Sequence, residues 1–511
     1  MKGLYLINPL SPSPSYLGGN IYEHYGLPQA VMIADLATVT VAAMAPDGFP
    51  VRVCEEQCQT VDLAPDEDYV GLTGKVNQWP RAMELARHFR SIGKKVILGG
   101  SFASLSSDTV RPYADILVRG ELEPIANEFF ADLVSGETQP EYQGAPADFS
   151  VPVQPRWDLY PLDRASMGSV QTSRGCPFEC EFCDVIVYAG RKQRHKPIEH
   201  VLAELDDLYG RGLRQIYLAD DNLTVYRRHA TELMTALRDW NHSRPDGAVH
   251  FATQLSVDLA REPALLALCA DAGLSTVFLG IETPEKASLK EAKKRQNLVD
   301  LEAAIEMFSR HGIAVQAGII AGFDNDDAGT FQRIAEFASR TPVGCYTVGL
   351  LVAPEGTPLY ARMAAAGRLL DTGHETIASP LMTNIVPAGM TPDELTCGIK
   401  WLCNELYDPK TFGARLVRHI ELFGESHMPD VPAGAGTGGP PRAVDDLSAA
   451  VLGKIPLMGP AEGAMVRKVI GAARKKPGAW PAVAWQLFLY MHARSMFDQA
   501  ETWGQRAVAA S

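Results

Sequence analysis

Three cysteines stand close together in the chain. Cys176, Cys180 and Cys183 lie within eight residues and follow the pattern Cys-x3-Cys-x2-Cys. A short loop with this spacing can turn all three thiolates toward one centre, and soft thiolates select zinc, copper(I) or iron–sulfur clusters. Three ligands leave one iron of a four-iron cluster without a protein ligand, so a substrate can chelate that iron. The spacing therefore favours a reactive iron–sulfur centre.

A structural zinc site or an inert group of thiols is the alternative. Structural zinc usually takes four ligands, often from two close cysteine pairs. No second Cys-x2-Cys lies downstream, because Cys397 and Cys403 are too far apart in sequence to form one. The nine cysteines are otherwise scattered and odd in number, which argues against a disulfide framework and favours a reducing compartment.

The bulk composition limits the classes of function. The chain has 511 residues, of which 46% are hydrophobic and 21% charged, as in ordinary globular domains. A net charge of −14 argues against a nucleic-acid partner, because phosphates are bound by basic surfaces. No apolar run approaches the roughly 18 residues of a transmembrane helix, and no targeting segment is visible. We expect a cytoplasmic protein, with peripheral membrane attachment left open.

The first 135 residues alternate apolar strands with amphipathic helices. The predicted strands are Leu4–Ile7, Val51–Cys54, Tyr69–Leu72, Val96–Leu98 and Ile116–Val118. The predicted helices are Leu27–Met44, Pro80–Ile92 and Glu123–Leu133. This alternation is typical of a parallel sheet covered by helices on both faces. We therefore predict an α/β fold that begins with a doubly wound, Rossmann-like domain over residues 1–140.

A second alternating series begins near Gly168. Its predicted strands are Ser169–Thr172, Gln215–Leu218, Val249–Thr253, Thr276–Leu279, Ala314–Ile319 and Tyr346–Leu351. Six strands with helices between them suit a partial (β/α)6 barrel, in which chemistry takes place at the carboxyl ends of the strands. The cysteine pattern follows the first of these strands.

The remaining boundaries follow from composition. We predict a linker at 141–160, the barrel at 161–385 and a C-terminal helical region at 386–511, because the pattern after Pro387 is helical only. Residues 429–442 are rich in Gly and Pro, which predicts a flexible loop.

The segment from Ser173 to Cys183, with Phe182 before its third cysteine, resembles the signature of the radical S-adenosylmethionine (SAM) superfamily. The resemblance implies a 4Fe–4S cluster on the three cysteines, with SAM bound to the open iron. It also implies that one electron, from a donor such as flavodoxin or ferredoxin, cleaves SAM to methionine and a 5′-deoxyadenosyl radical. That radical abstracts a hydrogen atom from the substrate.

Several later strand ends resemble SAM-contacting positions of the same superfamily. The second barrel strand is followed by an acidic turn, the third ends in a glutamine and the fourth ends in a glutamate. The resemblance places SAM contacts at Phe182, Asp220, Asp221, Gln254 and Glu282. Each acidic residue also has a structural alternative, such as capping the next helix.

The segment from Asp68 to Glu123 resembles the cobalamin-binding domain that precedes some radical SAM barrels, and Pro354–Leu359 resembles the turn that closes the barrel in that subgroup. The chain is thus similar to class B radical SAM methyltransferases. The resemblance implies cobalamin contacts at Thr73, Gly74, Lys75, Gln78, Gly99, Gly100, Ser101, Gly120 and Glu121. One departure is the loop Glu55–Cys58, which has no histidine to ligate cobalt. An empty α/β scaffold is the alternative.

Two further segments allow a functional and a structural interpretation. Gly190–Lys196 carries four cations and a histidine, which suit either an anionic ligand or ordinary salt bridges, and we favour salt bridges. The aromatic-rich helix at Trp480–Phe497 suits either contact with a lipid or membrane surface, or packing on its own core.

Three functions fit these residues. The leading hypothesis is a radical SAM enzyme that uses a 4Fe–4S cluster and cobalamin to methylate an unactivated carbon of a small-molecule or lipid-like biosynthetic intermediate. The second keeps both cofactors but carries out ring contraction, cyclisation or another SAM-derived group transfer. The third is a non-catalytic metal-binding scaffold. The sequence singles out no catalytic side chain and no substrate.

Overall fold

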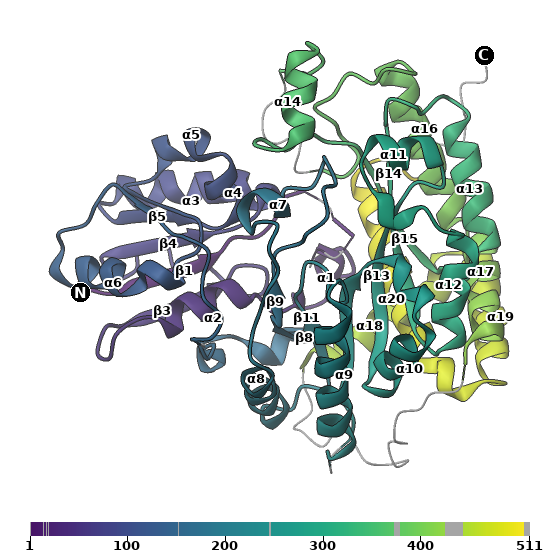
Figure 1. Ribbon diagram of the computed structural model, residues 1–511, viewed down its shortest axis with the longest axis horizontal. Coiled ribbons are helices and arrows are strands. Elements are labelled where there is room, and N and C mark those ends of the chain that lie inside the picture. The colour runs from purple at the N-terminus through teal and green to yellow at the C-terminus, as the bar shows by residue number, and fades with distance from the viewer. Residues whose placement is uncertain are drawn as a thin grey trace.

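The computed structural model describes residues 2–504, except positions 14, 17, 19, 152, 245–246, 372–378 and 425–442. The predicted loop at 429–442 lies outside the described residues. Two parallel sheets organise the chain, one at the left of Figure 1 and one at its centre.

The N-terminal sheet has six parallel strands in the order β3-β1-β4-β5-β6-β7. Their bounds are β1 (Leu4–Asn8), β3 (Val51–Glu55), β4 (Tyr69–Thr73), β5 (Lys95–Gly99), β6 (Ile116–Arg119) and β7 (Glu141–Gln143). The accompanying helices are α2 (Leu36–Ala43), α3 (Trp79–Ser91), α4 (Ser101–Leu105), α5 (Ser107–Val110) and α6 (Ala126–Ser135). The strand order reverses between β1 and β4, and ligands of doubly wound sheets bind outside the carboxyl ends of strands at such a point.

The last strand of this sheet lies in the segment predicted as a linker. β7 pairs in parallel with β6, and the hydroxyl of its buried Tyr142 donates to Asp132 at 2.6 Å. The linker prediction is therefore wrong at the start of 141–160. The strand has three residues, too few for a pattern of alternation to be visible in the sequence.

The second sheet is open and curled, with seven strands in the order β15-β14-β13-β12-β11-β8-β2. The strands are β2 (Val31–Ile33), β8 (Ala165–Val170), β11 (Gln215–Leu218), β12 (His250–Leu255), β13 (Leu274–Glu282), β14 (Ala314–Ala321) and β15 (Cys345–Leu350). The helices along the barrel are α8 (Ile198–Gly210), α9 (Arg227–His242), α10 (Pro263–Asp271), α11 (Lys286–Glu291), α12 (Leu301–Arg310), α13 (Thr330–Arg340) and α14 (Pro358–Ala365). All six predicted barrel strands are present.

The seventh strand, β2, comes from the N-terminal segment. It pairs in parallel with β8, and the Ala34 amide donates to the Met167 carbonyl at 2.9 Å. The helix predicted over Leu27–Met44 is therefore wrong in its first half. α2 begins only at Leu36, where the carboxylate of Asp35 accepts the Thr38 amide as an N-cap. The chain between β1 and β3 thus crosses to the barrel and returns.

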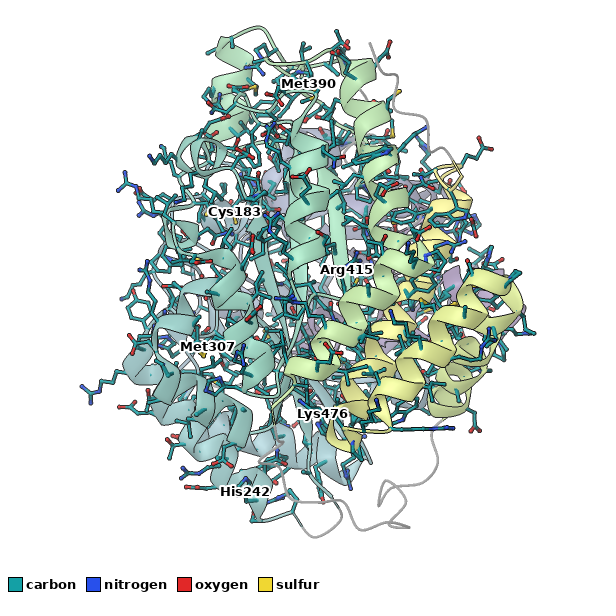
Figure 2. All side chains as sticks on the ribbon, turned by 90° about the vertical axis from the view of Figure 1, so that its right-hand side faces the viewer. Cys183, His242, Met307, Met390, Arg415 and Lys476 are labelled. Atoms are coloured by element: carbon teal, nitrogen blue, oxygen red, sulfur yellow. The ribbon has the colours of Figure 1, made fainter. Side chains whose placement is uncertain are left out.

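The C-terminal region is helical in its described part, as expected. It comprises α16 (Pro392–Tyr407), α17 (Pro409–Leu422), α18 (Ala443–Met458), α19 (Pro460–Ala473) and α20 (Trp480–Gln499). Figure 2 shows these helices against the barrel, where the guanidinium of Arg415 on α17 donates to the Val343 carbonyl at 2.9 Å. None of the helices in the described ranges is long and apolar enough to cross a membrane.

The aromatic helix α20 is a core helix. Leu487 and Phe488 are buried, and the ring of Phe488 lies 6.4 Å from that of Tyr22 in α1 (Asn20–His24). Trp480, the first residue of α20, is 45% exposed. The packing alternative is therefore correct for this helix, and its apolar side chains do not form a lipid-facing surface.

Candidate functional site

The cysteine loop, which we define as residues 174–184, leaves the barrel just beyond the carboxyl end of β8. Before it, β9 (Ser173–Arg174) pairs antiparallel with β10 (Arg194–His195), and α7 (Val185–Tyr188) follows it. Cys180 is buried, whereas Cys176 and Cys183 are half-buried.

The three thiols suit a cluster better than a single ion. Burial raises the pKa of the Cys183 thiol to about 12, and the charges of Asp184 and Cys180 add to this effect. Thiolates at such depth are costly unless a cation or metal compensates them. In the described residues, no three His, Cys, Asp or Glu side chains converge on one metal ion. A four-iron cluster does not require the three thiolates to meet at one atom, because each thiolate ligates a different iron. Its preference for soft donors also matches these three cysteines.

Asp220 holds the start of the cysteine loop. Its carboxylate is buried and accepts the Thr172 amide at 3.0 Å, the Thr172 hydroxyl at 2.7 Å, and both the amide and the hydroxyl of Ser173. Burial raises the pKa of Asp220 to about 6. Both oxygens are thus engaged in fixing the strand-to-loop junction. The structure therefore makes Asp220 a positioning residue, in contrast to the SAM contact that the sequence suggested.

Asp221 lies beside the first cysteine. It accepts the Gly175 amide at 2.7 Å, and its charge raises the pKa of Cys176, whose own burial is the larger cause. Burial also raises the pKa of Asp221 itself. Asp221 therefore presents a carboxylate to the region that a cluster would occupy.

Glu282 and Lys294 form a buried ion pair facing the cysteines. Glu282 ends β13 with a left-handed φ of 63°, and its Oε1 lies 2.6 Å from Lys294 Nζ. Burial opposes the charge of Lys294, but the anions of Glu282 and Cys180 outweigh it and raise the pKa of Lys294 above its ordinary value. The sequence analysis missed Lys294, whose one signal is its place in the run Lys293-Lys294-Arg295.

The segment after α11 forms a wall against the cysteine loop. The Glu181 amide donates to the Ala292 carbonyl at 3.2 Å, and Gln296 Nε2 donates to Cys180 Sγ at 3.5 Å. Asn297 fixes this segment to the barrel by donating to the Gly280 carbonyl at 2.8 Å. Nothing in the sequence marks Gln296 as a neighbour of the cluster cysteines.

The two other predicted SAM contacts lie at the edge of this region. Gln254 is exposed at the end of β12, where its amide donates to the Tyr217 hydroxyl at 3.1 Å. Phe182 packs edge-on against Phe323, with ring centroids 6.4 Å apart. Gln254 thus has an accessible amide, whereas Phe182 belongs partly to the core beneath the cysteine loop.

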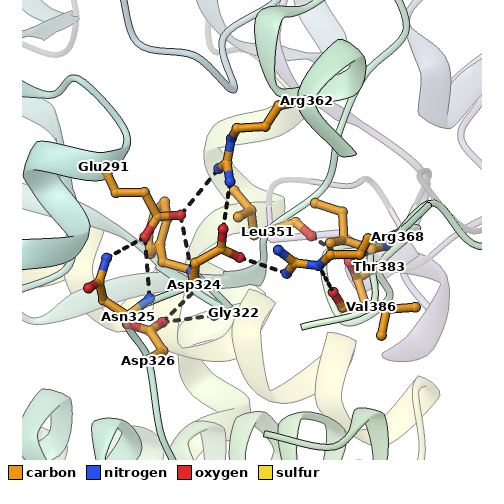
Figure 3. A network of polar contacts seen from close by, with 12 residues as sticks. Glu291, Gly322, Asp324, Asn325, Asp326, Leu351, Arg362, Arg368, Thr383 and Val386 are labelled. Carbon is orange, nitrogen blue, oxygen red and sulfur yellow. Dashed lines mark hydrogen bonds and ion pairs between the residues drawn. The ribbon is translucent and has the colours of Figure 1, made fainter. Parts of the chain in front are cut away.

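A network of ion pairs ties the end of β14 to the cysteine loop. Figure 3 shows Arg362 between Asp324 and Glu291, at 2.5 and 3.2 Å. The same guanidinium reaches Glu181 of the cysteine loop at 2.5 Å. Gly322 adopts a left-handed φ of 109° in this turn, a conformation that L-residues rarely adopt. Arg362, on α14, therefore links the cysteine loop to the turn that follows β14.

The N-terminal sheet carries a pocket at the carboxyl ends of β4 and β5. Its empty volume is about 260 Å³. Five of the predicted cobalamin contacts line it, namely Thr73, Gly74, Lys75, Gln78 and Gly99. We call it the Rossmann pocket. Trp79 and Phe102 give it apolar walls, and Ser101 starts α4 next to Phe102.

Two glycines allow the backbone around the Rossmann pocket to pack closely. Gly100 has a left-handed φ of 95°, and a Cβ added there would lie 2.8 Å from Thr73 Oγ1. A Cβ added at Gly74 would lie 3.0 Å from Gln78 Oε1. Gln78 is itself held by Asn8, whose Oδ1 accepts the Gln78 amide at 2.7 Å.

Gly120 and Glu121 lie at the junction between the two sheets and do not line the Rossmann pocket. Glu121 accepts Arg194 at 2.6 Å, Arg174 at 2.7 Å and the Ala147 amide at 2.8 Å. Gly120 packs closely on the Gly144 carbonyl. The structure therefore gives this pair a role in joining the domains, which differs from the predicted cobalamin contact.

The Rossmann pocket adjoins the cysteine loop. α4, at the rim of the pocket, contacts α7, which directly follows the cysteine loop. Burial raises the pKa of Asp184, the residue after Cys183, and the charge of Lys75 lowers it. Two ligands bound at these places would be neighbours.

The basic segment Gly190–Lys196 is engaged in ion pairs, as we favoured. Arg191 pairs with Glu179 at 2.8 Å, Arg194 with Glu121, and Lys196 with Glu204. These cations brace the cysteine loop and the domain junction.

Comparison with known proteins adds family information. The Radical SAM superfamily profile matches residues 170–338, and a domain of unknown function (DUF4070) matches residues 357–504. The chain is 34% identical to the uncharacterized methyltransferase sll1242 of Synechocystis, covering 79% of this chain and 76% of that protein. It is 31% identical to the hopanoid C-2 methylase of Rhodopseudomonas palustris, covering 65% of this chain and 64% of that protein.

A solved structure shares the whole fold. The cobalamin-dependent SAM radical enzyme OxsB, with aqua-cobalamin and SAM bound, superposes with a TM-score of 0.59 at 15% identity, covering 98% of this chain and 80% of that one. The likeness extends over both sheets and the C-terminal helices, so the predicted fold class is confirmed.

Proposed function

This chain belongs to the radical SAM family in which a cobalamin-binding-type domain precedes the barrel, and we propose that it is a cobalamin-dependent methyltransferase acting on an unactivated carbon. The observation that carries the proposal is the contact between the Rossmann pocket and the cysteine loop. A methyl donor and a radical source must both reach the same substrate carbon. The methyltransferase and methylase names of the two relatives support the same reaction class.

We propose that Cys176, Cys180 and Cys183 hold a 4Fe–4S cluster and that the Rossmann pocket holds cobalamin. When bound, the cluster supplies the electron that cleaves SAM, and cobalamin carries the methyl group. The protein's own residues position these groups. Asp220 fixes the start of the cysteine loop, Arg362 fixes Glu181 between its second and third cysteines, and Lys294 places a cation beside the thiolates.

SAM contacts are proposed at Asp221, Gln254 and Glu282, with Phe182 alongside. Asp221 suits the cationic amino group of SAM, because it lies next to Cys176 and presents a carboxylate. Gln254 offers an exposed amide to a carboxylate or ribose. Glu282 is paired with Lys294, and on SAM binding its carboxylate would contact SAM in place of Lys294 or together with it.

The substrate is proposed to be a small-molecule or lipid-like biosynthetic intermediate. The hopanoid C-2 methylase, a relative at 31% identity, favours an apolar polycyclic substrate. We propose that such a substrate binds where the Rossmann pocket adjoins the cysteine loop, because both cofactors must reach it there.

The test is anaerobic reconstitution with iron, sulfide and cobalamin, followed by incubation with SAM, a reductant and candidate substrates. A methyltransferase adds one CH2 to the product mass and consumes about two SAM per turnover, as the chemistry of one methyl donor and one radical requires. Cys397→Ala, at an exposed cysteine, is the matched control for Cys176→Ala. A product without added mass would point to ring contraction or cyclisation. The absence of 5′-deoxyadenosine would refute the proposed radical SAM activity.

A further inference from the structure

A positively charged surface lies over the cysteine loop. The segment 286–295, which comprises α11 and the turn after it, contains five cations and one carboxylate in a chain whose net charge is −14. Four of the cations are exposed, namely Lys286, Lys290, Lys293 and Arg295. In the part of the chain that the structure describes, none of these four side chains has an ion-pair or hydrogen-bond partner. We call them the basic face.

The carboxylates nearest in sequence do not neutralise the basic face. Glu285 is paired with Arg333 at 2.7 Å, and Glu291 is paired with Arg362 at 3.2 Å. Both anions are thus committed to arginines of other elements. The charge of the basic face is available to a partner.

The C-terminal part of the basic face lies next to the cysteine loop, since the Ala292 carbonyl accepts the Glu181 amide at 3.2 Å. Lys293 has a left-handed φ of 55° and is exposed, whereas its neighbour Lys294 turns inward to Glu282. Arg295 is exposed again, and Gln296 turns inward to donate to Cys180 Sγ at 3.5 Å. Lys293 and Arg295 are thus sequence neighbours of Lys294, which is paired with Glu282, and Arg295 directly precedes Gln296, which contacts the proposed cluster ligand Cys180.

We propose that the basic face is the docking surface for a small acidic electron-carrier protein of the flavodoxin or ferredoxin class. The inference rests on the proposed function, because it requires a cluster on the cysteine loop. One electron passes from the carrier to the cluster; the carrier is oxidised and the cluster reduced, with no bond made or broken. Electron-transfer rates fall steeply with distance, so the carrier must dock where the cluster lies closest to the surface. Opposite charges speed such encounters and orient them.

The experiment reverses part of the basic face and measures cluster reduction by stopped-flow absorbance. The test protein carries Lys290→Glu, Lys293→Glu and Arg295→Glu, and keeps the inward Lys294. With reduced flavodoxin at low salt, we expect the rate to fall about tenfold or more, and added salt to slow the wild type but not the variant. The matched control carries Arg467→Glu, Lys468→Glu and Lys475→Glu, three exposed cations of α19 and the turn after it, and should behave as wild type.

Small reductants separate docking from damage to the cluster. Dithionite and reduced methyl viologen are small molecules, so neither needs an extended protein surface. Dithionite is an anion and reduced methyl viologen is a cation, so a change of local charge shifts their rates in opposite directions. Both should still reduce the variant and support formation of 5′-deoxyadenosine. The docking proposal is overturned if flavodoxin reduces the variant at the wild-type rate, or if the control slows equally. If the wild type forms a cluster but yields no 5′-deoxyadenosine with dithionite, the proposed function fails, whereas the flavodoxin rates still decide the docking.

Discussion

The cysteine loop and the Rossmann pocket are built in opposite ways. Side chains hold the cysteine loop, where Asp220 accepts four donors and Arg362 reaches Glu181 from α14. At the Rossmann pocket the backbone packs closely at glycines, since a Cβ added at Gly74 or Gly100 would lie within 3.0 Å of Gln78 or Thr73. The first site should therefore fail when a side chain is removed, and the second when a side chain is added.

The largest effect is expected at the cluster ligands. Cys176→Ala removes one of three thiolates, and two ligands do not hold a cubane against loss of iron. We expect complete loss of iron–sulfur absorbance and of 5′-deoxyadenosine formation. Iron and sulfide analysis of anaerobically prepared protein checks this, with Cys397→Ala expected to retain full iron content. Retention of iron in the Cys176 variant would contradict the assigned ligand set.

The next effect tests the support of the cysteine loop. Asp220→Ala leaves the buried donors of Thr172 and Ser173 without an acceptor, and each such donor costs about 1–3 kcal/mol. We expect the free energy of unfolding to fall by roughly 3 kcal/mol, with reduced iron content, measured by urea denaturation. Asp221→Asn serves as comparison and should leave stability nearly unchanged while weakening SAM binding. Equal stability losses in both variants would mean that the two neighbours do not differ in role.

A smaller effect concerns the carboxylate of Glu55, which is linked to the Rossmann pocket through Asn8 and Gln78. Glu55 accepts the amide of Asn8 at 2.7 Å, and Asn8 in turn holds Gln78. Burial raises the pKa of Glu55 to about 7. The folded protein therefore binds this proton more tightly than the unfolded chain, in which a glutamate has a pKa of about 4.3. The free energy of unfolding falls as the pH rises between these two values.

Glu55→Gln should remove this loss of stability, which we expect to amount to about 2.5 kcal/mol between pH 5 and pH 8. Denaturation at several pH values measures it. Asp220 also has a raised pKa, of about 6, so both proteins will lose some stability in this range. The difference between wild type and variant isolates Glu55, and parallel curves would refute its assigned titration.

The smallest effect adds a side chain to the Rossmann pocket. Gly100→Val must adopt a left-handed φ of 95° with its Cβ 2.8 Å from Thr73 Oγ1. Because Thr73 lines the pocket, the added side chain should displace it, and we expect cobalamin to bind about tenfold more weakly, a loss of about 1.4 kcal/mol. Iron content should not change. Gly48→Val, which has a similar φ of 82° and open space around it, controls for strain alone. Titration of cobalamin by absorbance distinguishes the two.

The sequence predicted the parts of the fold that are long and repetitive. All six barrel strands and the C-terminal helices follow from patterns that span many residues, and the cysteine spacing carries its own chemistry. β2 and β7 were not predicted, because each has three residues and becomes a strand only by pairing outside its own segment, β2 with β8 and β7 with β6. Local sequence does not contain that partner.

The roles of individual polar residues were harder to predict. Asp220 and Asp221 are adjacent in sequence, yet Asp220 holds the loop and Asp221 lies beside Cys176. Glu121 matched a cobalamin-domain turn, but its carboxylate binds Arg174 and Arg194. In both cases the answer depends on which distant groups approach the side chain, and this is decided only by the packed structure.

The place of β2 bears on how the protein is made. Residues 31–33 leave the ribosome long before β8, the strand with which they pair. Synthesis proceeds from the N-terminus, so this short segment must wait unpaired until more than 130 further residues, counted from Ile33 to Val170, have been added. A fragment that starts at residue 141 would lack β2 and would expose β8 as an open, aggregation-prone edge.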